Sequence, residues 1–344
     1  MTRPPMPWPY FAAQPGTVIP DRANAQGAAV ISSPDDVTAA VLAEVERARD
    51  PRTRELLAAA VRHLHAFVRE TRLTEAEFQH IAGIVARLGQ LTSESHNEVV
   101  LIAGSLGVSS LVCLQNNGAG GAHETTANLL GPFWRAGSPR ERNGASIVRS
   151  PTPGDPIFVT GSVVGPDGRP VADAEVDVWN TSGEGLYENQ DPRQADMNLR
   201  GTFVTDSGGR FSFRTVKPAG YPIPVNGPVG DLLRAQGRHN MRPAHIHFLI
   251  SKPGYKTQFS QVYDSDDANL ETDAQFGVTA ALVGSYLEHD TATEPAPDPG
   301  VTGTWHSLQH RFVIEPGDSS LPKPPITAKA TGDVPVQEIL EREP

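Results

Sequence analysis

The chain has 344 residues, 38% hydrophobic and 20% charged, a composition typical of a globular protein of one large domain or two ordinary ones. The formal net charge of −11, with no basic run, argues against a nucleic-acid partner. The single cysteine, Cys113, excludes an intrachain disulfide and a zinc cluster built from thiolates.

The N-terminal arm, residues 1–34, is rich in proline. Its beginning, MTRPPMPWPYFAAQPG, lacks the continuous apolar core of a secretory signal. No run elsewhere approaches the ~18–20 apolar residues of a membrane span. We therefore expect a cytoplasmic protein without a membrane span.

Residues 35–130 have apolar side chains at helical spacing. One helix is expected to follow the acidic start at Asp35, and a second to open near Pro51. A third is expected after Thr74, which has a glutamate three residues later in the pattern of a capping box. The more apolar residues 93–117 predict one helix buried between the others. Together these segments predict a helical domain.

From about residue 155 the apolar period changes to two, which is typical of strands. The turn signals GPDG (165–168) and DSGG (206–209) each lie between short β-rich runs, which predicts two hairpins. More such runs follow, namely HIHFLI, TQFSQVY and HRFVIEP. We expect an antiparallel β-sandwich over residues 131–318, and hence an α+β fold. The C-terminal arm, residues 319–344, is rich in proline and lysine at first and is expected on the surface.

The segment RPAHIHFLI (242–250) places His245 and His247 two residues apart in a predicted strand. Residues i and i+2 of a strand face the same side with Cα atoms ~6.6–7 Å apart, so both imidazoles can reach one metal ion. The same spacing at His63 and His65 falls on a predicted helix, which turns the two side chains ~200° apart. The histidine pair is therefore a candidate chelate only in the strand.

Two of the six tyrosines lie in unusual settings. Tyr187 lies in the polar loop TSGEGLYENQDP, and Tyr221 lies in the Gly/Pro-rich segment KPAGYPIPVNGP. Either one alone is more often a packing residue. Together with His245 and His247, two phenolates would make a donor set of two nitrogens and two oxygens, which favours trivalent iron over zinc or copper(I).

The segments GLYENQ, AGYPIPVNGPVGDLL and GRHNMRPAHIHFLISKPGY resemble the iron-binding core of the intradiol ring-cleavage dioxygenases, the group of catechol and hydroxyquinol 1,2-dioxygenases. The resemblance includes LLGPFW (129–134) and runs from about residue 35 to 316. It implies a helical linker and dimerisation domain (35–130) before a β-sandwich catalytic domain. It also implies a homodimer, with a possible lipid at the helical interface.

The resemblance carries four residues over as ligands of a non-haem Fe(III): Tyr187, Tyr221, His245 and His247. It further implies that Tyr221 accepts a substrate proton, that Arg242 stabilises negative charge on the substrate, and that Gln261 supports the site. The expected partners are a catecholic substrate and O2. The implied reaction cleaves the ring bond between two hydroxylated carbons and gives a muconate- or maleylacetate-type dicarboxylate.

Further positions match the substrate pocket of the family: Leu101, Gly104, Leu130, Pro132, Phe133, Ile223, Pro224, Arg242, Phe276 and Gly277. The surrounding segments look closest to the hydroxyquinol branch. However, Gly104 stands where hydroxyquinol enzymes tend to have an acidic residue, and Gln261 follows the catechol pattern. We expect a catecholic substrate, with hydroxyquinol slightly preferred over catechol.

Two other functions fit parts of the sequence. A non-catalytic β-sandwich binding module would share the turn-rich strands and would need no metal. A zinc-dependent hydrolase could use His245, His247 and a carboxylate, and it would be colourless. Tyrosinate bound to Fe(III) absorbs visible light, so colour separates the dioxygenase from both alternatives.

Overall fold

The computed structural model describes residues 30–117, 126–332 and 337–342. Residues 1–29 of the expected N-terminal arm lie outside this description. The chain divides into two compact units, the first ending at Gly83 and the second beginning at Ile84.

The first unit contains α1 (Pro34–Val45) and α2 (Pro51–Thr71), which pack against each other. The carboxylate of Asp50 caps α2 by accepting a hydrogen bond from the backbone N–H of Thr53 at 2.6 Å. His63 and His65 lie on this helix, which confirms that their spacing there is not that of a strand.

The helix α3 (Glu75–Leu91) begins with the predicted capping box. The side chain of Glu77 accepts a hydrogen bond from the Thr74 backbone at 2.8 Å, and the hydroxyl of Thr74 accepts one from the Glu77 backbone at 3.3 Å.

The prediction of one helix over residues 93–117 is wrong, because this stretch forms α4 (Glu98–Ser105) and α5 (Val108–Asn116), bent by 77°. Gly107 adopts a left-handed backbone (φ 72°) at the break, which ends the first helix. Among the described residues no single helix is long and apolar enough to cross a membrane. Of the bent helix pairs in that part of the chain, only α4 and α5 reach that length and apolar composition when the two are counted together.

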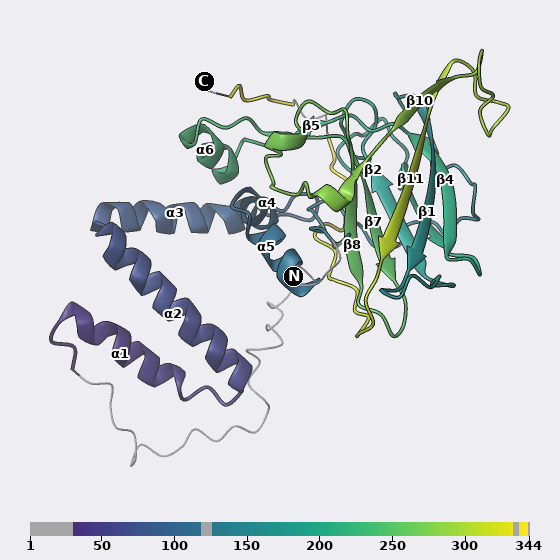
Figure 1. The fold of residues 1–344 in the computed structure, drawn as a ribbon. Coiled ribbons are helices and arrows are strands. Elements are labelled where there is room, and N and C mark those ends of the chain that lie inside the picture. The colour runs from purple at the N-terminus through teal and green to yellow at the C-terminus, as the bar shows by residue number, and fades with distance from the viewer. Residues whose placement is uncertain (1–29, 118–125, 333–336, 343–344) are drawn as a thin grey trace, which may run out of the picture. The chain divides into compact units, whose positions relative to one another are not determined.

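Most strands belong to two sheets (Figure 1). The four-stranded sheet has the order β10-β11-β1-β4 and the five-stranded sheet the order β3-β2-β7-β8-β9. Their bounds are β1 (Pro156–Val164), β2 (Glu175–Asn180), β3 (Arg200–Val204), β4 (Arg210–Val216), β7 (His245–Ser251), β8 (Gln258–Asp264), β9 (Val283–Gly284), β10 (Leu287–Asp290) and β11 (Thr304–Val313). A third pair joins β5 (Tyr221–Pro222) to β6 (Met241–Arg242), with α6 (Pro228–Ala235) between them in sequence.

The sandwich is mixed rather than purely antiparallel. Strand β1 pairs with β11 in parallel, and β8 pairs with β9 in parallel, while the other pairs of the two sheets are antiparallel. A tight turn forces its two strands to run in opposite directions, whereas partners joined by a long connection are free to run in parallel. The predicted α+β class holds, and its antiparallel detail needs this correction.

The two predicted hairpins are also wrong. The turns form locally, since the Gly165 N–H donates to the Arg169 carbonyl and the Asp206 N–H to the Arg210 carbonyl, both at 2.9 Å. However, β1 and β2 belong to different sheets, as do β3 and β4. Each turn therefore passes the chain from one sheet to the other, and both flanking strands can then bury apolar faces in the same core.

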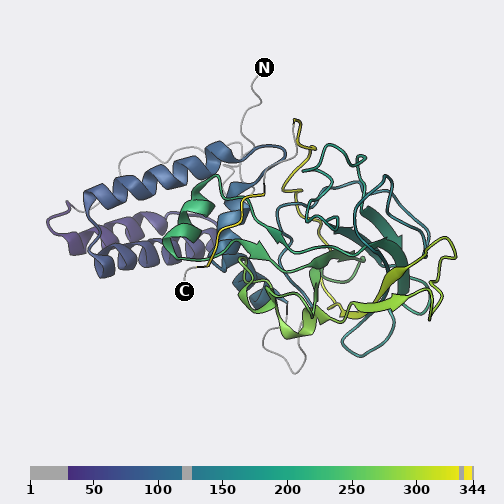
Figure 2. The ribbon, with the colours of Figure 1, turned by 90° about the horizontal axis from the view of Figure 1, so that it is seen from above.

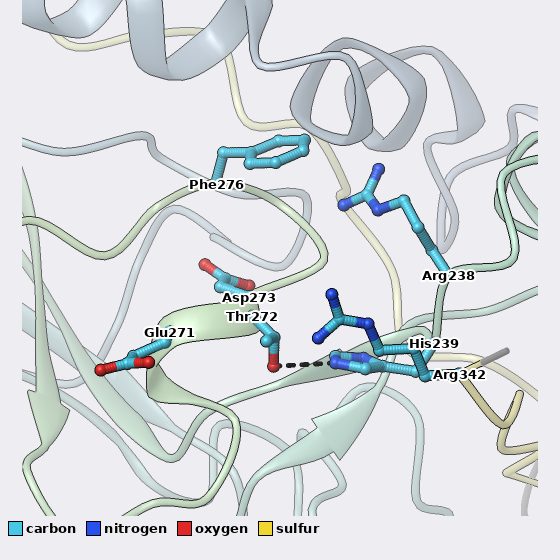
Figure 3. Close-up of a pocket in the computed structure, with 7 residues that line it drawn as sticks. All are labelled: Arg238, His239, Glu271, Thr272, Asp273, Phe276 and Arg342. Carbon is cyan, nitrogen blue, oxygen red and sulfur yellow. Dashed lines mark hydrogen bonds between the residues drawn. The ribbon is translucent and has the colours of Figure 1, made fainter. Parts of the chain in front are cut away.

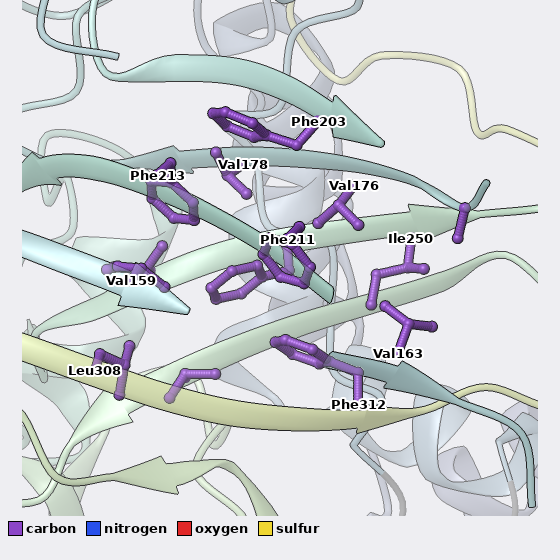
Figure 4. Packing of buried hydrophobic residues seen from close by; sticks show 14 of the residues in the cluster. Val159, Val163, Val176, Val178, Phe203, Phe211, Phe213, Ile250, Leu308 and Phe312 are labelled. Carbon is purple, nitrogen blue, oxygen red and sulfur yellow. The ribbon is translucent and has the colours of Figure 1, made fainter. Parts of the chain in front are cut away.

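The core between the two sheets is apolar and rich in phenylalanine (Figure 4). It includes Val159 of β1, Phe211 and Phe213 of β4, Val176 of β2 and Phe312 of β11. Strand β7 contributes alternate residues, Ile246, Phe248 and Ile250. Because side chains alternate along a strand, the other residues of this run, His245, His247 and Leu249, face away from this core. The candidate site therefore lies on the outer face of the five-stranded sheet.

Candidate metal centre

The strand register places the two histidines among aromatic and amide neighbours. His247 lies opposite Trp179 of β2 and Gln261 of β8, and His245 lies opposite Tyr263 of β8. The indole of Trp179 stacks on the His247 ring, with centroids 4.5 Å apart and planes 10° apart. The sheet thus orients the imidazole of His247 before any ligand is bound.

Tyr187 lies in the loop after β2 and is fully buried. Its ring stacks on Phe133 at 4.5 Å, which brings the LLGPFW segment to the site. The next residue, Glu188, is anchored by two arginines, Arg200 at 2.6 Å and Arg135 at 2.8 Å. This buried ion-pair network holds the loop that presents the phenol.

Tyr221 reaches the site from β5, directly opposite Arg242 of β6. The Tyr187 loop packs closely against it at Gly185, where an added Cβ would lie 2.9 Å from the Tyr221 Cβ. Gly185 also has a left-handed backbone (φ 75°). A glycine at this position therefore permits the approach of the two phenols.

The four predicted ligand atoms converge on one point. The Tyr187 hydroxyl lies 2.9 Å from His247 Nε2, 3.2 Å from the Tyr221 hydroxyl and 3.4 Å from His245 Nε2. The two Nε2 atoms are 3.2 Å apart. Atoms bound ~2.0–2.1 Å from one metal ion at angles near 90–110° are about 2.9–3.4 Å from each other. These four separations therefore match the spacing of ligands to a single ion.

The protonation of the histidines also suits a metal. His245 Nδ1 lies 2.7 Å from the Pro243 carbonyl, so Nδ1 carries the proton and Nε2 directs its lone pair at the centre. Burial, and then the charge of Arg242, lower the pKa of His245 to about 3. Burial, and then His245, lower the pKa of His247 well below its ordinary value. Both imidazoles are therefore neutral, as metal ligands must be.

Burial has the opposite effect on the pKa of the two phenols, which it raises. Burial, reinforced by the neighbouring Tyr221, raises the pKa of Tyr187 well above its ordinary value. Burial also raises the pKa of Tyr221, although the charge of Arg242 opposes it. Phenolates at this point therefore need a strongly charged cation, which a metal ion supplies.

Arg242 is buried beside the centre, with Nη1 3.4 Å from His245 Nε2. Its Nε donates to Asp273 at 2.9 Å, and its Nη2 donates to Gln261 and Tyr263, both at 2.9 Å, and to Asp273 at 3.0 Å. Gln261 in turn donates to the Leu129 carbonyl at 2.7 Å. The guanidinium is therefore held on several sides.

Two members of this network, Tyr263 and Asp273, were not among the predicted site residues. Tyr263 could have been found, because it lies two residues after Gln261 and so on the same face of β8. Asp273 follows the short 3-10 helix Leu270–Thr272 and has no periodic signal. Burial lowers the pKa of Arg242 and raises that of Asp273, but the attraction between the two charges outweighs it. The pKa of Arg242 is raised and that of Asp273 lowered as a result.

Several predicted pocket residues gather around the phenols. Leu101, Phe133 and Ile223 form one buried cluster with Tyr187 and Tyr221, and Leu130 packs against it.

The other pocket positions differ in their surroundings. Pro132 is buried and Pro224 half-buried. Gly277 adjoins the arginine network, where an added Cβ would lie 2.4 Å from the Tyr263 hydroxyl. Gly131, which the prediction left out, has φ 75° and would place a Cβ 3.3 Å from His247 Cε1.

Phe276 lies outside the buried cluster. Its side chain is half-exposed and its ring centroid is 4.4 Å from the guanidinium carbon of Arg238. Both line an outer pocket of about 300 Å³, together with Asp273, whose carboxylate also pairs with Arg242 (Figure 3). This pocket therefore adjoins the Arg242–Asp273 pair.

Gly104 is covered by the side chain of Gln275. A Cβ at Gly104 would lie 1.8 Å from Gln275 Oε1, so the amide occupies the space that a side chain at position 104 would need. Gln275 is buried and donates to the Ser105 hydroxyl at 2.7 Å. The amide of Gln275 thus packs directly over Gly104.

A zinc hydrolase would need a third ligand such as a carboxylate beside the histidine pair. Within residues 30–117, 126–332 and 337–342, no group of three or more His, Cys, Asp or Glu side chains is placed to hold a metal ion. The geometry therefore favours the tyrosine-containing donor set over the hydrolase alternative.

Comparison with known proteins gives matches over most of the chain. The family model described as "Dioxygenase" matches residues 129–308, and "Catechol dioxygenase N terminus" matches residues 50–123. The chain is 40% identical to a hydroxyquinol 1,2-dioxygenase of Rhizobium sp. (strain MTP-10005), over 80% of this chain and 92% of that protein. It is 38% identical to a catechol 1,2-dioxygenase of Candida albicans, over 70% and 80%. The crystal structure of hydroxyquinol 1,2-dioxygenase from Pseudomonas putida DLL-E4 matches with a TM-score of 0.72 and 35% identity, over 83% of this chain and 99% of that one.

Proposed function

This chain belongs to the intradiol ring-cleavage dioxygenases, and we propose that it uses a non-haem Fe(III) to cleave hydroxyquinol with O2. Both oxygen atoms of O2 enter the product, a maleylacetate-type dicarboxylate. The observation that carries the proposal is the convergence of two phenol oxygens and two imidazole nitrogens: the Tyr187 hydroxyl lies 2.9–3.4 Å from the other three atoms, and the two Nε2 atoms are 3.2 Å apart.

Tyr187, Tyr221, His245 and His247 would hold the iron. Two phenolates supply hard negative oxygen, which suits Fe(III). When bound, Fe(III) would supply Lewis acidity toward the diol and so prepare the ring for O2. We assign Tyr221 the further role of accepting a substrate proton at its phenolate oxygen.

Arg242 supplies the positive charge on the substrate side. Its guanidinium lies beside His245, and its other partners fix its direction. A preorganised charge in a site without water stabilises negative charge that develops on the ring. The apolar side chains of Leu101, Phe133 and Ile223 would exclude water from this space.

The preference for hydroxyquinol is supported by the relatives. The matches at 40% and 39% identity are named hydroxyquinol and 6-chlorohydroxyquinol 1,2-dioxygenase, from Rhizobium sp. and Cupriavidus pinatubonensis. A third hydroxyl needs a polar partner if it is to be selected. We propose that the amide of Gln275, lying over Gly104, is that partner.

Replacing Gln275 by leucine should therefore change substrate choice. We expect kcat/KM for hydroxyquinol to fall about 10- to 100-fold relative to kcat/KM for catechol, because one hydrogen bond to a buried hydroxyl is lost. The measurement is O2 uptake with each substrate. Gln309, exposed on β11, provides a matched control as Gln309→Leu, which should leave the ratio unchanged. An unchanged ratio in the Gln275 variant would assign selection to another residue.

Colour and turnover of the iron-loaded protein test the proposed function. We expect a visible absorption band from phenolate-to-Fe(III) charge transfer, and one O2 consumed per hydroxyquinol cleaved. A metal-replete sample without that band would contradict the proposal. The binding module and the zinc hydrolase both predict a colourless protein.

We also propose that the protein is a homodimer joined through its helices. Within the first unit, large apolar side chains are exposed on α2, at Leu64 (63%) and Phe67 (46%), and on α3, at Phe78 (61%). Clustered exposed apolar groups mark interaction sites on a protein surface. Sedimentation equilibrium should give the mass of two chains, and a single-chain mass at micromolar concentration would contradict the proposal.

A further inference from the structure

The C-terminal arm was expected on the surface, but part of it is buried at the site. Ile326 is 1% exposed and belongs to the same apolar cluster as Tyr187 and Tyr221, and Leu340 packs against that cluster. We propose that this arm is a positioning element of the metal centre, which holds the two phenols at their spacing. The expected effect on turnover rests on the proposed function, whereas the expected effect on the position of the two phenols does not.

The arm holds the Tyr187 loop on both sides of the tyrosine. The Ala330 N–H donates to the carbonyl of Asn189, two residues after Tyr187, at 2.7 Å. The side chain of Gln337 donates to the carbonyl of Gly185, two residues before Tyr187, at 3.0 Å. The loop has no strand partner at these positions, so the arm supplies hydrogen bonds that a sheet would otherwise provide.

The same arm holds the short β5–β6 pair that carries Tyr221 and Arg242. The buried amide of Asn240 donates to the Glu338 carbonyl at 2.9 Å and accepts from the Leu340 N–H at 2.9 Å. Asn240 also joins the Tyr221 side of the pair, since its amide donates to the Ile223 carbonyl at 2.7 Å. The arm therefore bonds to both segments that present a phenol.

Two further contacts fix the ends of the arm. Near its start, the Thr327 N–H donates to the Glu94 carbonyl at 2.8 Å. Near its end, Glu338 pairs with Arg234 of α6 at 2.8 Å, and Figure 2 shows the yellow C-terminal segment running along that helix. Thr327 and Glu338 thus also anchor the arm to segments other than the Tyr187 loop and the β5–β6 pair.

These contacts matter because neither phenol lies on a long strand. Strands β5 and β6 have two residues each, and Tyr187 lies in a loop. A site works only when its groups stay within about 0.5 Å of their productive positions. Displacement by about 1 Å costs roughly 100-fold in rate. The family model ends at residue 308, so the arm lies beyond the part of the chain that it describes.

Two isoleucines of the arm provide a matched test. Ile326 is buried and Ile339 is 57% exposed, so Ile326→Ala removes the apolar anchor while Ile339→Ala removes only exposed surface. We expect Ile326→Ala to speed hydrogen exchange at Gln190 and Ile223 at least about 10-fold in the iron-free protein, with no change in the core strands β1 and β11. The Ile339→Ala variant should match the parent.

A second pair tests the hydrogen bonds without disturbing the core. Gln337→Ala removes the contact to Gly185, and Glu341→Ala, at another exposed position, is its control. In the iron-loaded protein, Gln337→Ala should shift or weaken the visible phenolate band and lower kcat/KM. Glu341→Ala should do neither.

The outcomes separate this inference from the proposed function. If the exchange rates and the visible band of Ile326→Ala and Gln337→Ala equal those of the parent, the arm does not position the phenols. If the parent itself shows no band when loaded with iron, the proposed function fails. The exchange measurement on the iron-free protein still decides the role of the arm in that case.

Discussion

Replacing Tyr221 by phenylalanine is expected to lower kcat at least about 100-fold and to remove part of the visible absorption of the iron-loaded protein. The substitution deletes one of the four converging oxygen and nitrogen atoms, and with it the group that we assign as a proton acceptor. General-base catalysis alone contributes about 10²–10⁴-fold. The measurements are steady-state turnover of hydroxyquinol and the visible spectrum at equal iron content.

Tyr286 provides the control for that variant. It is buried, its hydroxyl donates to the Val262 carbonyl at 2.8 Å, and it belongs to the core between the sheets rather than to the cluster around the phenols. Tyr286→Phe should therefore cost about 1 kcal/mol of stability and leave the colour unchanged. If Tyr221→Phe kept the full absorption of the parent, Tyr221 would not be a ligand.

Replacing Asp273 by asparagine is expected to lower the free energy of unfolding by about 3–5 kcal/mol, because it leaves the buried charge of Arg242 without its counter-ion. Both side chains are at most 3% exposed and are joined by hydrogen bonds of 2.9 and 3.0 Å. Turnover should also fall, since the guanidinium loses the group that sets its direction. Urea unfolding of the iron-free protein and kcat/KM of the loaded protein measure the two effects.

The exposed pair Arg193–Glu184 is the control for Asp273. Its side chains are 56% and 47% exposed, so Glu184→Gln should cost less than about 1 kcal/mol. A similarly small cost at Asp273 would show that Arg242 does not depend on this partner.

The loss of unfolding free energy caused by Asp273→Asn should also depend on pH. The pKa of Asp273 is lowered from its ordinary value of 3.8. A carboxyl with a lowered pKa stabilises the fold above its unfolded pKa, and this stabilisation is lost as the pH falls through the folded pKa. The difference between parent and Asp273→Asn should therefore be constant near neutral pH and shrink below about pH 4.

Local features of the molecule could be predicted well. The cap of α3 depends on two residues three apart, Thr74 and Glu77, and its contacts formed as expected. The contrast between His63/His65 and His245/His247 also held, because it depends only on the period of the element that carries each pair. The assignment of Tyr187 and Tyr221 depended instead on resemblance to a family.

Features that depend on distant pairing could not be predicted. The GPDG and DSGG turns formed, but which sheet each flanking strand joins depends on partners far along the chain. Likewise, the break between α4 and α5 depends on Gly107 adopting a left-handed backbone, which the apolar pattern does not report. Asp273 and Gln275 reach Arg242 and Gly104 only through the folded loop after β8.

The sequence by itself determined the α+β class, the candidate chelating pair His245/His247 and, through resemblance, the family and its proposed donor set. Periodicity and short motifs suffice for these features because they express interactions between residues close in the chain. Only the tertiary structure decided the mixed sheets, the buried partners of Arg242 and the placement of the C-terminal arm against both phenol-bearing segments. Those contacts join residues about 30 to 150 positions apart, and no local pattern encodes which distant group fills a given space.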